Sequence, residues 1–218
     1  MTDHRKTHIA VVLDRSGSMN LIRTDTIGGF NAFLADQRKA PGDCTMTLVQ
    51  FDDQYEVNYV DRPIADVLNL NEFTFVPRGS TAMLDAIGRT IDEVGKKLAA
   101  MPEDARPGKV VVVIITDGHE NASKEFTREK IKAMIELQRH TYNWQFVYLG
   151  ANQDAVETGA ALGISKGLSS TYSGALVQQA FAATAHNIVS LRGMDGDGAS
   201  LCAYSSTQRE AMVSGDTK

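Results

Sequence analysis

Cysteine is scarce in this sequence, with only two in 218 residues. Cys44 and Cys202 lie far apart in apolar surroundings, which predicts two buried free thiols and argues against a disulfide framework or a cysteine-based zinc site. Long hydrophobic runs are also missing. No stretch approaches the ~20 apolar residues of a membrane span, and the apolar run after residues 1–6 is too short for a signal peptide. These absences favour a cytoplasmic protein without a membrane partner.

Positive charge is in short supply as well. The chain has 22 Lys and Arg against 27 Asp and Glu, a formal net charge of -5. Nucleic-acid binders usually present a concentrated basic face, so we expect no nucleic-acid partner. What the chain does have is a hydrophobic fraction of 43%. Over this length that is enough to bury the core of one α/β domain without disulfides.

Short apolar runs predict the strands of a sheet. They are too short, and too rich in β-branched or aromatic residues, to be free-standing helices, so they predict buried central strands. The three clearest are residues 8–13 (HIAVVL), 109–116 (KVVVVIIT) and 144–149 (WQFVYL). Residues 44–60 contain two more extended segments around a polar turn, which predicts a hairpin that adds one antiparallel edge strand.

Helical periodicity fills the gaps between these strands. Apolar residues at spacings of three and four predict helices over residues 19–39, 81–100, 127–140 and 173–192. Thr127 is the expected N-cap of the third helix, whereas Gly28 and Gly29 weaken the first. Alternating strands and helices require a doubly wound, mostly parallel central sheet with helices on both faces. We expect this domain to span residues 1–192, followed by a polar C-terminal tail, 193–218, that is loosely packed or disordered.

Oxygen-bearing side chains gather where the predicted strands end. Ligands of open α/β sheets bind beyond the carboxyl ends of the strands. There the first strand ends in Asp14, followed by Ser16 and Ser18 at alternate positions whose side chains can point the same way. Thr81 opens a helix, and Asp117 follows the longest apolar strand. Two carboxylates and three hydroxyls are hard donors that suit Mg²⁺, with Mn²⁺ or Ca²⁺ as alternatives.

This set resembles the metal-ion-dependent adhesion site (MIDAS) of von Willebrand factor A (vWA) domains, of the intracellular bacterial or phage type. The MIDAS motif is Asp-x-Ser-x-Ser with a distant Thr and a distant Asp, and all five positions match here. The resemblance covers about residues 7–192 and implies a Rossmann-like fold with the metal at one end of the sheet. It also implies that Ser16, Ser18 and Thr81 touch the metal, while Asp14 and Asp117 bind largely through water. By family analogy, an AAA+ ATPase or a component of a stress-resistance cluster is the partner to expect.

Hydroxyl ligands leave much of the cation's charge uncompensated, so such a site favours an exposed Asp or Glu carboxylate of a partner protein. Catalysis would also need a positioned base or nucleophile, and no convincing pair stands out. We therefore expect a metal-dependent protein-binding module of the adhesion type, and not an enzyme.

Two alternatives stay open. One is a metal-dependent phosphohydrolase, although haloacid-dehalogenase-like phosphatases need a second Asp where this chain has Ser16. The other is a structural assembly component whose metal site binds an acidic residue of a neighbouring copy of the same chain.

Other residues near these loops are candidates for a role in binding. Arg15 and Met19 flank the first metal loop, and His119 follows Asp117 closely, so all three are candidates for contacting the partner. His119 could make binding sensitive to pH. The acidic stretches at residues 52–53 and 195–198 lack the terminal Glu of an EF-hand loop and are interpreted as turns.

Overall fold

The computed structural model describes residues 2–151, 153–194, 196, 200, 201 and 203–214. Its centre is a six-stranded sheet in the order β3-β2-β1-β4-β5-β6. The strands are β1 (Asp3–Asp14), β2 (Asp43–Phe51), β3 (Tyr55–Pro63), β4 (Pro107–Thr116), β5 (Gln145–Ala151) and β6 (Ser169–Tyr172). The helices are α1 (Arg23–Lys39), α2 (Met83–Ala100), α3 (Arg128–Tyr142), α4 (Ala155–Ala161), α5 (Val177–Arg192) and α6 (Ser206–Ser214). Five 3-10 turns join them: η1 (Gly17–Ile22), η2 (Ile64–Asp66), η3 (Glu103–Ala105), η4 (Lys166–Leu168) and η5 (Gly174–Leu176).

The sheet confirms the predicted fold class. Strands β2, β1, β4, β5 and β6 run parallel, and β3 pairs antiparallel with β2 at the edge. Side chains are buried without interruption over the last eight residues of both β1 and β4. This is the pattern of central strands covered on both faces, and it explains why the apolar runs were visible in the sequence.

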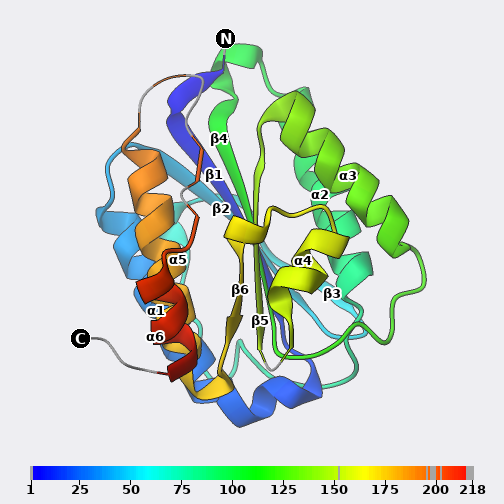
Figure 1. The fold of residues 1–218 in the computed structure, drawn as a ribbon. Coiled ribbons are helices and arrows are strands. Elements are labelled where there is room, and N and C mark those ends of the chain that lie inside the picture. Colours follow the sequence, from blue (N-terminus) through cyan, green and yellow to red (C-terminus); the bar gives the residue numbers. More distant parts are fainter. Residues whose placement is uncertain (1, 152, 195, 197–199, 202, 215–218) are drawn as a thin grey trace.

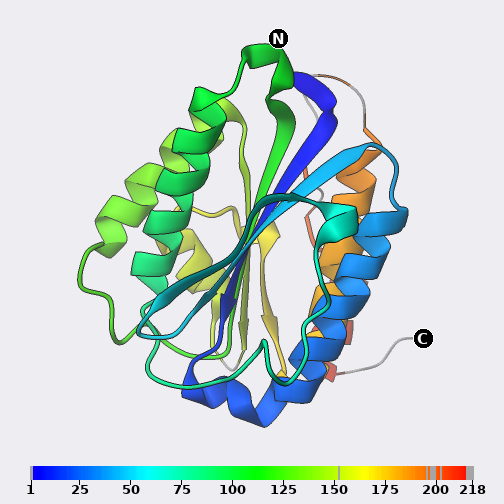
Figure 2. The ribbon, with the colours of Figure 1, turned by 180° about the vertical axis from the view of Figure 1, so that it is seen from behind.

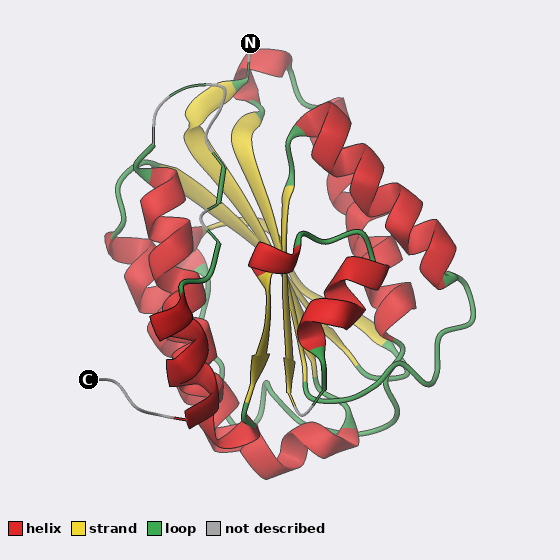
Figure 3. Cartoon of the chain, viewed as in Figure 1, coloured by secondary structure: helices red, strands yellow, loops and turns green. Residues whose placement is uncertain are grey.

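Helices form a layer on each face of the sheet. Figure 1 shows α1, α5 and α6 on one side and α2, α3 and α4 on the other, and Figure 3 shows the strands between the two layers. Gly29, the second of the two glycines that weakened the first predicted helix, has a packing reason. A Cβ on Gly29 would lie 2.5 Å from the ring of Phe181 in α5, so a residue without a side chain is needed where α1 crosses α5.

The carboxyl ends of the parallel strands meet at one end of the molecule, opposite the N-terminus in Figures 1 and 2. Strand order reverses between β1 and β4, because the chain leaves β1 toward β2 on one side and later returns to β4 on the other. Open α/β sheets hold their ligands at such a switch point. The sequences that leave β1 and β4 therefore lie where a ligand is expected.

Part of the predicted tail is folded, which corrects the expectation of a loosely packed or disordered segment after residue 192. Leu201, Tyr204 and Met212 are buried, the Tyr204 hydroxyl lies 2.6 Å from Thr184 Oγ1, and α6 follows. These anchors are too widely spaced to form a periodic pattern in the sequence. Cys44 is a buried free thiol, whereas Cys202 and most of the predicted turn at 195–198 lie outside the described residues. None of the helices among the described residues combines the length and apolar content of a membrane span.

Candidate metal centre

Asp14 ends β1 and is completely buried. Its Oδ1 accepts a hydrogen bond from the Ser16 N–H at 2.6 Å, and its Oδ2 accepts one from the Thr116 hydroxyl at the end of β4, also at 2.6 Å. Both donors are neutral, and burial raises the pKa of this carboxyl from 3.8 to about 6, against the lowering effect of these hydrogen bonds. Asp14 is therefore an acid whose ionised form the surrounding protein does not fully compensate.

The two serines and Asp117 form a chain of contacts toward the solvent. Ser16 Oγ lies 3.1 Å from Ser18 Oγ, and the Ser18 hydroxyl donates to Asp117 Oδ1 at 2.6 Å. Burial raises the pKa of the Asp117 carboxyl, while the bond from Ser18 lowers it. Ser16 is buried, Ser18 is exposed and Asp117 lies between these extremes. The group is thus inaccessible to solvent at Asp14 and accessible at Ser18.

Thr81 approaches this group from the segment before α2. A Cβ placed on Gly118 would lie 3.4 Å from Thr81 Oγ1 and 3.5 Å from Ser18 Oγ, so both hydroxyls point toward the same small space over Gly118. The structure brings together all five side chains predicted as metal ligands: Asp14, Ser16, Ser18, Thr81 and Asp117. Their role as ligands stays a prediction.

The loop before α2 is tied to the first metal loop. The Gly17 N–H donates to the carbonyl of Gly79 at 3.1 Å, and the Arg78 N–H donates to the carbonyl of Arg15 at 2.8 Å. Gly79 has a φ of +66°, and a Cβ there would come within 2.2 Å of Asp53 Oδ1. Only glycine meets both demands, so this residue allows the loop before Thr81 to lie against the serine loop.

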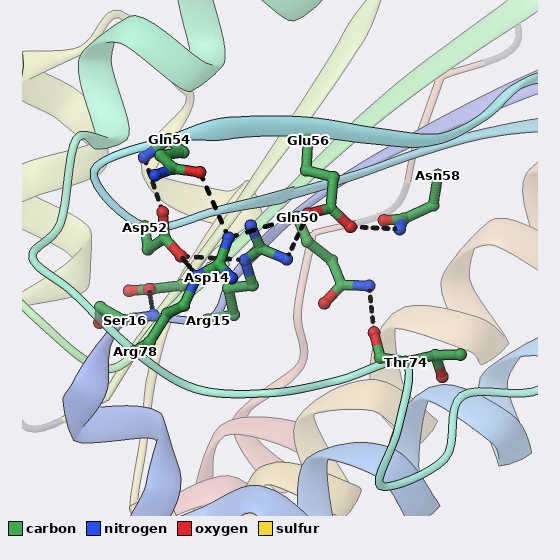
Figure 4. A network of polar contacts seen from close by, with 10 residues as sticks. All are labelled: Asp14, Arg15, Ser16, Gln50, Asp52, Gln54, Glu56, Asn58, Thr74 and Arg78. Carbon is green, nitrogen blue, oxygen red and sulfur yellow. Dashed lines mark hydrogen bonds and ion pairs between the residues drawn. The ribbon is translucent and has the colours of Figure 1, made fainter.

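Arg15 was predicted to contact a partner, and the structure shows that this is wrong. Its side chain is buried, with Nε 3.1 Å from Asp52 Oδ2 and Nη1 2.8 Å from Glu56 Oε2. Arg78 Nε reaches the same Asp52 oxygen at 2.8 Å. Figure 4 shows this network beside Asp14 and Ser16. Arg15 points away from the solvent because Asp52 in the β2–β3 turn and Glu56 in β3 bind it.

The other two candidates for partner contact differ from each other. Met19 is fully buried, because η1 turns its side chain into the core, so the expectation that it contacts a partner is wrong. His119 is exposed, and a partner role for it stays a prediction.

Several residues that support the site were not found from the sequence. Besides Thr116, the Tyr172 hydroxyl donates to the carbonyl of Thr116 at 3.1 Å, and Gln153 Nε2 donates to the carbonyl of Gly118, also at 3.1 Å. Through these two bonds, β6 and the segment after β5 hold the end of β4 in place. The hydroxyl of Thr116 at a strand end was the one signal available, since it stands beside the Asp117 already singled out.

Comparison with solved structures identifies the architecture. Proximal thread matrix protein 1 (PTMP1) from the mussel byssus matches with a TM-score of 0.62 at 19% identity, over 86% of this chain and 46% of that one. A von Willebrand factor type A structure from Catenulispora acidiphila matches with a TM-score of 0.55 at 13% identity, over 84% and 43%. The chain has the von Willebrand factor A fold.

The same comparison includes a zinc-bound structure. PTMP1 with a zinc-occupied MIDAS motif matches the vWA fold of this chain with a TM-score of 0.58 at 16% identity, over 84% of this chain and 46% of that one. The chain thus spans a little under half the length of these solved proteins. At the level of sequence, no family model and no curated protein matches it.

The residues of this vWA fold suit a hard divalent cation. Among the described residues, no three or more His, Cys, Asp or Glu side chains gather as a candidate metal cluster. The candidate site consists of two carboxylates and three hydroxyls. Oxygen donors of this kind suit Mg²⁺. Besides burial, the nearby Asp117 carboxylate raises the pKa of Asp14, so one cation close to both carboxylates would compensate both charges.

Proposed function

We propose that this chain is a metal-dependent protein-binding module in which a divalent cation, Mg²⁺ in the first place, holds an acidic side chain of a partner protein. Ser16, Ser18 and Thr81 would hold the cation directly, and Asp14 and Asp117 would compensate its charge. The observation that carries this proposal is that the five side chains form one connected group: Ser18 contacts Ser16 and Asp117 and shares the space over Gly118 with Thr81. Asp14, beside Ser16, is buried and bonded only to neutral donors.

The cation would supply a positive charge that the hydroxyl ligands do not cancel, and a partner's Asp or Glu carboxylate is the natural complement. Our proposal includes no catalytic role for this site. Two exposed apolar side chains at the same end favour a protein as the partner. Leu21 in η1 and Phe73 in the loop before α2 are each 91% exposed, the largest exposed fractions among the large apolar side chains that the structure describes.

These two side chains belong to segments that lie against each other. Arg23 Nε donates to the carbonyl of Phe75 at 3.0 Å, and Gly17 and Gly79 are joined at the other end of the contact. Phe73 is held in a turn in which Asn71 Oδ1 accepts from its N–H at 2.8 Å. A partner that offers a carboxylate to the cation would meet this apolar rim.

The comparisons support a metal site without identifying its ion or its partner. One similar protein holds zinc in its MIDAS motif, so Zn²⁺ should be tested beside Mg²⁺, Mn²⁺ and Ca²⁺. An AAA+ ATPase or a component of a stress-resistance cluster is our proposed partner class, by analogy only, and the cytoplasm is the proposed location.

Calorimetric titration of the metal-free protein tests the proposal. We expect one Mg²⁺ or Mn²⁺ site per chain in the wild type and none in Asp14→Ala. Asp53→Ala is a matched control, because Asp53 is an exposed acid of the neighbouring hairpin outside the five-residue set. Unchanged metal binding in Asp14→Ala would refute the metal site. A partner that is retained with Mg²⁺, lost with chelator and not retained by Asp14→Ala would establish the binding role.

The two alternatives make different predictions. A phosphohydrolase would turn over a generic phosphoester and lose that turnover in Ser16→Ala. A self-assembling component would change its light scattering when chelator is added, with no second protein present. On our proposal neither change occurs.

A further inference from the structure

Helix α2, which follows Thr81, lacks an N-cap of its own. Its N-cap position is Ala82, whose methyl group accepts no hydrogen bond, although the first turn of any helix leaves backbone N–H groups without partners inside the helix. The loop after β4 supplies the partners instead. The Leu84 N–H donates to Glu120 Oε2 at 2.8 Å, and the Asp85 N–H donates to Ser123 Oγ at 3.1 Å.

Glu120 is itself held in place by its own loop. Its Oε1 accepts from the N–H groups of Ala122 and Ser123 at 2.9 and 2.7 Å, and its Oε2 accepts from the Ser123 hydroxyl at 2.8 Å. With Leu84, four donors surround one carboxylate. The side chain is therefore committed to the start of α2, although it lies only three residues after Asp117.

Asn121 pairs with Thr81 at two points. Its Oδ1 accepts from the Thr81 N–H at 2.9 Å, and its own N–H donates to the Thr81 carbonyl at 3.0 Å. Both backbone groups of Thr81 are thus bonded to the loop that carries Asp117. A shift of that loop relative to α2 would break both bonds and move the Thr81 hydroxyl.

Asp85 closes the link from the other side. Its carboxylate accepts from the N–H groups of Lys124, Glu125 and Phe126 at 2.8, 2.9 and 2.9 Å. The loop caps the helix, and the helix holds the loop. The relative position of Thr81 and Asp117 is therefore set by a reciprocal set of bonds, which we call the α2 clamp (Asp85, Glu120, Asn121 and Ser123).

We propose that Glu120 and Asn121 are positioning residues for the metal site, which they serve by fixing the Thr81 hydroxyl opposite Asp117. This inference rests on the proposed function. Ser16 and Ser18 share one loop, but Thr81 and Asp117 come from separate segments, which the α2 clamp joins directly. Mg²⁺ tolerates little departure from octahedral geometry, so its binding depends on that placement.

The test compares metal affinity with stability in the same variants. The dissociation constant for Mn²⁺ is measured by calorimetry, and the melting temperature is measured in chelator. Residues that orient metal ligands change affinity by 10–100-fold when lost, so we expect Glu120→Ala to weaken Mn²⁺ binding about 10-fold or more. Glu120→Gln keeps an acceptor for the Leu84 N–H and should restore part of this loss.

Thr127→Ala is the matched control. It removes the N-cap bond of α3, in which the Thr127 hydroxyl accepts from the Lys130 N–H, and α3 carries none of the five candidate ligands. We expect it to lower the melting temperature and leave the Mn²⁺ dissociation constant within twofold of the wild type. Asn121→Ala, which removes an exposed side chain, provides the test if Glu120→Ala does not fold, and it should weaken binding at least threefold.

The outcomes separate this inference from the proposed function. If Glu120→Ala or Asn121→Ala lowers the melting temperature while Mn²⁺ affinity stays within twofold, the clamp is only structural and the inference is overturned, although the metal site stands. If the wild type binds no Mn²⁺, the proposed function fails and the inference fails with it.

Discussion

Asp14 and Asp52 lie at the ends of neighbouring strands, and both are fully buried. The first carboxylate oxygen of each accepts the same kind of hydrogen bond. In each, Oδ1 accepts from the N–H group two residues later at 2.6 Å, from Ser16 and from Gln54 respectively. The second oxygen is where they differ. Asp52 Oδ2 meets the guanidinium groups of Arg15 and Arg78, whereas Asp14 Oδ2 meets only the Thr116 hydroxyl.

The two acids therefore differ in whether the chain compensates their negative charge. A buried carboxylate is costly unless an opposite charge or enough hydrogen bonds compensate it. The chain supplies that charge to Asp52, which therefore holds the hairpin and the loop before α2 together. It supplies none to Asp14, whose pKa is raised to about 6 by burial. On the proposed function, the cation would supply the positive charge that Asp14 lacks.

The largest loss of stability should come from neutralising Asp52, the acid that the two arginines compensate. Asp52→Asn leaves the buried Arg15 guanidinium with Glu56 alone, and removing one partner of a buried ion pair costs about 3–5 kcal/mol. Urea unfolding in chelator measures the loss. Arg78→Gln is the control, because the Arg78 side chain is 51% exposed and solvent screens its ion pair, so its removal should change stability little. An equal, small loss in both variants would show that Asp52 is not compensated as the structure indicates.

Metal should stabilise the protein through the uncompensated acid. A ligand at 100 times its dissociation constant stabilises the folded state by about 2.7 kcal/mol, which raises the melting temperature of a chain of this size by about 5–10 °C. Calorimetric scans with Mg²⁺ and with chelator measure the shift. Arg78→Gln should show the full shift and Asp14→Ala none. The same melting temperature with and without metal in the wild type would contradict the comparison.

Asp14→Asn should have the opposite sign from Asp52→Asn when metal is absent. Neutralising an acid that lacks a cationic partner removes a charge penalty, so we expect a gain of about 1–2 kcal/mol in chelator at pH 7. Because the pKa of Asp14 is raised to about 6, the penalty is present above that pH and disappears as pH falls toward 3.8. The gain should shrink accordingly in urea unfolding at pH 4. A loss of stability at pH 7 would mean that Asp14 is compensated after all.

The three strands that the sequence predicted most clearly, β1, β4 and β5, are buried on both faces, and their apolar runs can be found without knowledge of their neighbours. The β2–β3 hairpin was predicted from two extended segments around a polar turn. Strand β6 escaped notice because Ser169-Ser170-Thr171-Tyr172 is short and polar, and its burial depends on α6 and on the bond from Tyr172 to β4. Helix α4 has seven residues, with Ala155 and Gly159 as its buried positions. Neither of these two small residues gives a hydrophobic stripe.

The candidate ligands could be predicted because their positions follow from where strands end. The role of Arg15 could not, because its partner Asp52 lies 37 residues away and nothing local to Arg15 indicates the pairing. The same holds for Glu120, which is near Asp117 in sequence but bonds to α2. Long-range polar pairing decides which residues of a strand-end loop face the solvent, and one sequence does not show it.

A third acid offers a smaller test of the same comparison. Asp61 in β3 is compensated by the chain, because Lys97 Nζ lies 3.1 Å from its Oδ2 and His8 Nδ1 lies 3.4 Å from its Oδ1. The hydrogen bond from His8 is the main cause that lowers the pKa of Asp61 below its usual 3.8. Its φ is +49°, a conformation that Asn tolerates well, so Asp61→Asn removes the charge with little change in backbone strain.

We expect Asp61→Asn to cost about 1 kcal/mol at pH 7, the smallest of these effects. A lowered pKa stabilises the folded state above the unfolded value and loses that contribution as pH falls through the folded value. The difference in unfolding free energy between wild type and variant should therefore narrow below about pH 4. The effect of Asp14→Asn also shrinks at low pH, but that effect is a gain of stability, whereas Asp61→Asn causes a loss. Urea unfolding of the wild type and Asp61→Asn at pH 7 and at pH 3 measures the loss and its narrowing. A difference that does not narrow would assign the loss to packing, and would limit the contrast between compensated and uncompensated acids to Asp52 and Asp14.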